Sequence, residues 1–262
     1  MYKWVRQGAT VVPPTPARGT AEGWVCGAQG RLDDVDAAWW AYWEKPADAD
    51  ELQAADELMG PLRQLGGYPD RRVLSPAKLR SVAHGIAKSK APGPDGWSAS
   101  HMRHWTATVW RRVSQFFDYV ERAQTWPATL CKGHVAMLEK GGTTDPLDVR
   151  PIVLLPQLYR LWATCRPKEL GRWMQDQGVQ LLPGTSRGSE DHGVWVAHLL
   201  AASRVHGREA GGVALDFSKA YDTMSLQLLQ QIAEACGMPA WLWRPMLSMY
   251  RGGRRVAVGG CV

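Results

Sequence analysis

The sequence predicts an α+β fold, on three observations. Apolar residues recur at the helical spacing of three or four in several segments, most clearly in residues 76–89 and 109–123. Residues 133–140 and 149–155 are short apolar runs joined by a stretch of Gly, Thr, Asp and Pro, which is typical of a β-hairpin. Residues 213–217 alternate as a half-buried strand and lead into another helical pattern.

Composition sets broad limits on the class of protein. The 262 residues, 45% of them hydrophobic, suffice for one large domain or two small ones. A net charge of +6 suits an acidic partner such as nucleic acid without requiring one. The 5 cysteines are scattered, with no Cys-x-x-Cys pair, so neither a zinc site nor a disulfide framework is indicated and a reducing intracellular compartment is the default.

No segment has the sequence of a membrane span or a secretory signal. The most apolar stretch, Ile152 to Cys165, is interrupted by polar residues and is too short to cross a bilayer. The first residues are followed by prolines rather than by an apolar run. We therefore expect no membrane association.

The N-terminal region is predicted to contain a lead without regular structure, followed by two helices. Residues 1 to about 30 are rich in Gly, Pro, Ala and Thr, which predicts an extended or poorly ordered lead. Residues 33–45 begin with acidic side chains and continue with helix formers, so a helix is expected. Its aromatic residues favour packing against the domain over stacking on bases. Residues 48–65 form a second predicted helix, closed by Gly66-Gly67. The aromatic residues are Trp39, Trp40, Tyr42 and Trp43.

A new segment begins at Ser75, which caps the predicted helix 76–89. It is followed by Lys90-Ala-Pro-Gly-Pro-Asp-Gly96, in which interleaved prolines and glycines predict a rigid non-helical loop, or merely a turn. Helices are then expected at 98–105 and 109–123. His101 and His104 share a face of the first, where a surface or core role is favoured over metal binding because no third ligand is near.

The predicted hairpin places Lys140 and Arg150 beside its tip. Such a pair suits the grip of a polyphosphate, because Arg offers a bidentate fork and Lys a point charge. A solvated basic turn is the simpler interpretation of the spacing alone. Helices are predicted after the hairpin at 156–174 and 193–204.

The strand at 213–217 carries Asp216 at its end, ahead of a predicted helix over 223–236. A carboxylate in this place is suited to metal binding at the rim of a sheet. From the pattern alone, an Asp in this place is more often a helix cap or a turn residue.

With these segments in order, the chain resembles a reverse transcriptase of the non-LTR retrotransposon kind from about Leu79 onward. The resemblance rests on Lys90-Ala-Pro-Gly-Pro-Asp-Gly96, Leu138-Glu-Lys140, Arg150-Pro-Ile152, Leu158-Tyr-Arg160 and Leu215-Asp-Phe-Ser-Lys-Ala-Tyr-Asp222, which occur in the family's order. Later segments, Cys236-Gly-Met-Pro-Ala-Trp-Leu242 and Met249-Tyr250, look like the family's helix after the first catalytic strand.

The resemblance implies roles for individual residues. Asp216 matches the first catalytic aspartate, a ligand of two Mg²⁺ ions about 3.5–4 Å apart in two-metal nucleotidyl transfer. Phe217 would give a backbone carbonyl to one metal. Tyr221 matches the aromatic that packs under the sugar and excludes a 2'-hydroxyl. Lys140 and Arg150 match the cations that hold the incoming triphosphate.

The resemblance also implies a right-hand polymerase fold. Residues 76–210 would be the fingers and 211–262 the start of an incomplete palm, with 1–75 an unassigned N-terminal flank. The expected partners are an RNA template, a DNA primer and deoxynucleoside triphosphates. The family's target-primed integration implies a nuclear location, although no basic localisation run is evident.

Two departures from the family pattern matter. The loop Leu182-Pro-Gly-Thr-Ser-Arg187 is shorter than the family's and lacks its Phe. No Tyr-x-Asp-Asp segment occurs, so we expect a fragment truncated before the central palm strands and inactive by itself, because one aspartate cannot hold two Mg²⁺ ions productively. The alternatives are a non-catalytic nucleic-acid-binding remnant and a decayed copy that does not fold stably.

Overall fold

The computed structural model describes residues 18–20, 23–25, 27–43, 49–60, 63, 65–68, 70–139, 145–177, 189–207, 219 and 222–258. Helices and a small sheet make up these residues, so the α+β class is confirmed. The chain divides into two compact units, Met1–Pro167 with Thr223–Val262, and Lys168–Asp222. The division into fingers and palm stays a prediction.

The N-terminal part contains more regular structure than expected. Strands β1 (Arg18–Thr20) and β2 (Gly23–Val25) pair antiparallel, and helix α2 (Gly27–Trp43) begins before residue 30. Of the expected extended or poorly ordered lead, β1 and β2 are extended, but the prediction missed the start of α2 at Gly27. Local composition misled the prediction, because α2 is stabilised by burying Leu32, Val35 and Trp39.

Helix α3 (Ala49–Leu58) is shorter than the predicted 48–65. A turn at Met59-Gly60 follows it, ahead of Pro61. A proline disfavours helical geometry in the residue before it and lacks the N–H that a helix needs, which explains the early end.

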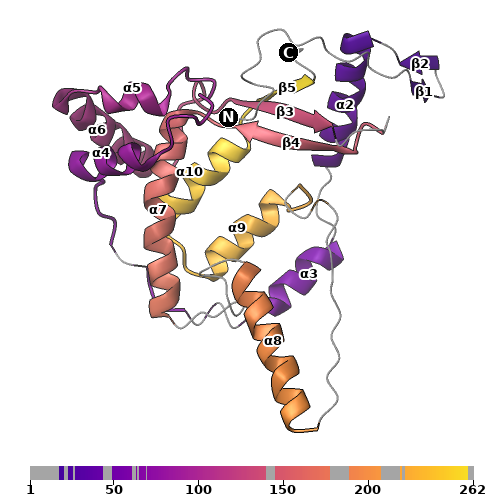
Figure 1. Cartoon of the computed structure of the whole chain (residues 1–262). Helices are drawn as coiled ribbons and strands as arrows, with labels where there is room; N and C mark the ends of the chain where they lie inside the picture. The colour runs from indigo at the N-terminus through magenta and orange to yellow at the C-terminus, as the bar shows by residue number, and fades with distance from the viewer. Residues whose placement is uncertain are drawn as a thin grey trace. The chain divides into compact units, whose positions relative to one another are not determined.

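Helices α4 (Pro76–Gly85), α5 (Ala99–Arg103) and α6 (Ala107–Ala123) fall on the predicted segments, although α4 ends four residues before the predicted residue 89. The three helices lie side by side (Figure 1). Ser75 caps α4 by accepting a hydrogen bond from the N–H of Lys78 at 3.2 Å. His101 and His104 are both exposed, as expected.

The main core joins α6, the first half of α7 (Gln157–Asp176) and α10 (Ala240–Tyr250). α6 contributes residues spaced three or four apart, as its sequence pattern predicts. These meet aromatic residues of α7 and the apolar face of α10. The buried residues are Trp110, Val113, Phe117 and Val120 from α6, Tyr159, Leu161 and Trp162 from α7, and Leu242 and Met249 from α10.

The sheet has the order β4-β3-β5. β3 (Gly133–Glu139) and β4 (Val149–Leu154) pair antiparallel, which confirms the predicted hairpin. β5 (Arg254–Val258) pairs parallel to β3, a pairing that was not predicted. α2 packs on one face of the sheet (Figure 1), where Val135, Met137, Val149 and Val256 meet its apolar side.

Two further helices follow the predictions closely. α8 (Ser189–Val205) covers the predicted helix 193–204, and α9 (Leu226–Ala235) lies within the predicted 223–236. The predicted strand at 213–217 lies outside the described residues.

Candidate functional site

The hairpin β3–β4 is the described part of the predicted site. Of the five predicted site residues, Arg150 lies on β4. Lys140, Asp216, Phe217 and Tyr221 lie outside the described residues, so their predicted roles stay predictions.

Arg150 lies on the face of the sheet opposite α2. Val149 is 2% exposed and packs in the cluster under α2, whereas Arg150, the next residue, is exposed. Side chains alternate along a strand, so Arg150 points away from α2. Its cross-strand partner is Leu138, which is half-buried.

The same open face carries a second arginine. His134 of β3 pairs with Leu154 on one side and with Arg255 of β5 on the other, and residues paired in this way share a face. His134 and Arg255 are exposed. The face therefore presents Arg150 and Arg255 to solvent, with half-buried Ala136 and Ile152 between them. It can accept an anionic or phosphate-bearing ligand.

Sequence reasoning missed Arg255 and His134. The Arg254-Arg255 pair precedes the alternating Val256-Ala-Val258, so a strand carrying an outward arginine was visible in the pattern. The pairing of this strand with β3 could not be predicted, because parallel strands are not joined by a short turn that the sequence would reveal.

The backbone of the loop at 90–96 packs closely against the C-terminal end of β4. A Cβ on Gly93 would lie 2.2 Å from the carbonyl oxygen of Leu155 and 2.8 Å from Cα of Pro156. These two residues link β4 to α7. Only glycine permits this contact, which gives the Pro-Gly-Pro-Asp-Gly sequence a packing reason beyond that of a turn.

Two hydrogen bonds between the loop and α7 strengthen this contact. A carboxylate oxygen of Asp95 accepts from the backbone N–H of Leu158 at 3.1 Å, which caps the first turn of α7. The guanidinium of Arg160 donates to the carbonyl oxygen of Ala91 at 2.6 Å and also to the side-chain oxygen of Gln157. Burial lowers the pKa of Arg160, and the neighbouring Asp95 carboxylate partly offsets this effect.

The start of β5 is hydrogen-bonded to the C-terminal end of α10. Arg254 donates to the carbonyl oxygens of Gly252 and Met249, each at 2.7 Å, and so neutralises the C-terminal end of α10. Tyr159 of α7 lies next to Tyr250 of α10. Burial, and then this neighbour, raise the pKa of the Tyr159 hydroxyl well above its ordinary value. Tyr159 is therefore neutral and its role is structural.

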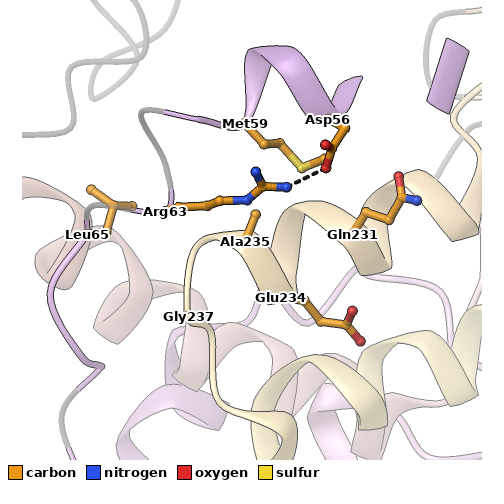
Figure 2. Close-up of a pocket in the computed structure, with 8 residues that line it drawn as sticks. All are labelled: Asp56, Met59, Arg63, Leu65, Gln231, Glu234, Ala235 and Gly237. Carbon is orange, nitrogen blue, oxygen red and sulfur yellow. Dashed lines mark hydrogen bonds and ion pairs between the residues drawn. The ribbon is translucent and has the colours of Figure 1, made fainter. Parts of the chain in front are cut away.

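A cavity of about 540 Å³ lies between α3 and α9 (Figure 2). Figure 2 shows Arg63 reaching across it to form an ion pair with Asp56. On the α9 side it is lined by Gln231, Glu234 and Ala235. Arg150, the described member of the predicted site, does not line this cavity.

Comparison with known proteins adds no relative. The chain matches none of the known protein families in a scan of family models, and a search of curated proteins found no match. Among the described residues, no helix is both long and apolar enough to cross a membrane.

Proposed function

We propose that this chain supplies the nucleotide- and template-binding fingers, and the first catalytic strand, of an RNA-directed DNA polymerase of the non-LTR retroelement type. In this proposal β3 and β4 are the triphosphate-binding hairpin of a right-hand polymerase. The substrates are deoxynucleoside triphosphates, and the macromolecular partners are an RNA template and a DNA primer.

The observation that carries the proposal is the convergence of the resemblance motifs. Residues 90–96 pack on the junction between Arg150-Pro-Ile152 and Leu158-Tyr-Arg160, about 60 residues later in the chain. Leu138, in the motif Leu138-Glu-Lys140, pairs with Arg150 across the hairpin. Tyr250, in the segment Met249-Tyr250, lies next to the buried Tyr159. These motifs are therefore neighbours in the fold as well as consecutive in the sequence, which supports the proposal that they serve one site.

Each predicted residue has a distinct task in this proposal. Arg150 is exposed on a strand held at both ends, so its guanidinium is available for bidentate bonds to phosphate oxygens. Lys140 adds a second cation at the tip. Asp216 and the Phe217 carbonyl would hold Mg²⁺, which would supply positive charge to the reacting phosphate. Tyr221 selects the deoxyribose.

Triphosphate binding tests the proposal on the chain itself. We expect dTTP with Mg²⁺ to bind in a calorimetric titration, and Arg150→Gln to weaken binding about tenfold, the loss of one charge-assisted pair. The matched control is Arg111→Gln, an exposed arginine on α6 that donates to Thr108. Equal affinities for the two variants would contradict the proposal. In any longer version that extends a primer on RNA, Asp216→Asn abolishes synthesis.

A non-catalytic nucleic-acid-binding role is the second candidate, favoured by Arg150 and Arg255 on one open face and by the net charge of +6. Both candidates predict that affinity for a template–primer duplex falls with salt, about tenfold between 50 and 200 mM for two phosphate contacts. Only the polymerase proposal predicts binding of the free triphosphate. Duplex binding without triphosphate binding would favour the second candidate.

A further inference from the structure

We infer that Trp39 of α2 is a positioning residue for the triphosphate-binding hairpin, so that the N-terminal flank is part of the nucleotide site. The inference rests on the proposed function of Arg150. It concerns a segment to which sequence patterns assign no role.

Trp39 joins α2 to the turn of the hairpin. Its indole Nε1 donates a hydrogen bond to the carbonyl oxygen of Pro146 at 3.0 Å, between residues 107 positions apart. The ring is 1% exposed and lies in the cluster with Met137, Val149 and Val256 from all three strands. A buried indole with its N–H satisfied has a single well-defined position, so the contact is specific as well as apolar.

The turn that Trp39 contacts is itself ordered by local bonds. A side-chain oxygen of Asp145 accepts from the N–H of Leu147 at 2.8 Å, and the carbonyl oxygen of Asp145 accepts from the N–H of Asp148 at 3.1 Å. Pro146, between them, is buried. Residues 145–148 are therefore a compact unit, and the bond from Trp39 fixes them to α2.

This attachment sets the direction of Arg150. Val149 follows the turn and is buried against α2, and Arg150 comes next on the opposite face. A turn that left α2 would release Val149 as well. Because side chains alternate, Arg150 would then lose its fixed orientation toward the open face. Trp39 acts through the backbone and touches no ligand.

The variant Trp39→Phe tests the inference, because it keeps an aromatic ring in the cluster and removes the N–H donor. We expect about fivefold weaker binding of dTTP with Mg²⁺. Amide hydrogens of residues 147–150 and of Ile152 should exchange faster with solvent. The matched control is Trp40→Phe at the next position, where the side chain is half-buried; its triphosphate affinity should equal that of the unaltered chain.

A double-variant comparison separates positioning from general destabilisation. If Trp39 acts through Arg150, W39F has no further effect on triphosphate affinity in the R150Q background. Additive losses would overturn the inference, as would unchanged affinity in W39F alone while R150Q weakens binding. If the unaltered chain binds no triphosphate, the proposed function fails and the inference with it, a result visible before any Trp39 variant is compared.

Discussion

The lock between the loop at 90–96 and the end of β4 is tested most directly by Gly93→Ala. The new Cβ would lie 2.2 Å from the carbonyl oxygen of Leu155, whereas ordinary contact begins at 3.4 Å. Its neighbours there are backbone atoms, which cannot turn aside as a flexible side chain would. The loop must therefore withdraw by about 1 Å or more.

This withdrawal determines how far the substitution lowers the free energy of unfolding. It breaks or stretches the bond from Leu158 N–H to Asp95 and the bond from Arg160 to the carbonyl of Ala91, now 3.1 and 2.6 Å long. Both involve a charged group, and overpacking adds its own cost, so the free energy of unfolding should fall by about 2–4 kcal/mol. In urea this shifts the unfolding midpoint down by about 1–2 M. Because β4 loses one of its anchors, triphosphate affinity should fall as well.

The matched control is Gly85→Ala at the end of α4, where an added Cβ meets nothing within 4 Å and the free energy of unfolding should change by less than about 1 kcal/mol. Unfolding is followed by tryptophan fluorescence in urea, and binding by calorimetry. A Gly93→Ala protein with the same midpoint as the control would refute the close packing of this loop. A lower midpoint with unchanged triphosphate affinity would refute its link to the hairpin.

The remaining predictions concern the charged residues of α6. Glu121→Ala should lower the free energy of unfolding by about 3–5 kcal/mol, because Arg166, 1% exposed and bonded to Glu121 at 2.6 Å, would lose the carboxylate that balances its buried charge. Arg122→Gln, which breaks the pair between an exposed arginine and half-buried Asp118, should cost under about 1 kcal/mol in the same urea titration. The hydrogen bond from Arg71 lowers the pKa of Asp118 below 3.8, so its stabilisation is complete above that pH and is lost as pH falls through the folded value. Asp118→Asn should therefore reduce the loss of stability between pH 5 and pH 3, and an unchanged pH profile would argue against the pair.

Much of the local structure could be predicted from the sequence. The hairpin and helices α4 to α9 are visible because apolar periodicity, Ser or Thr caps and Gly or Pro breaks act over a few residues. Arg150 was assigned to the hairpin on the same grounds. The helix at 48–65 was predicted too long, since its pattern was followed past Pro61.

Other features follow from contacts between distant segments. Nothing in the composition of residues 1–30 indicates the strands β1 and β2 or the early start of α2, because burial against the sheet stabilises that helix. The buried pair of Glu121 and Arg166 was likewise not predicted. A charged residue on a helix normally faces solvent, and only the packing of α6 against α7 takes this one out of water.

The sequence by itself determined where the chain turns, which stretches form helices or the hairpin, and which residue types stand at the proposed site. The tertiary structure decided that β5 lies parallel to β3, that Gly93 touches Leu155, and that Trp39 holds Pro146. Local patterns record which face of an element is buried. They do not record its partner, because that choice depends on how all the apolar surfaces of the fold are buried together.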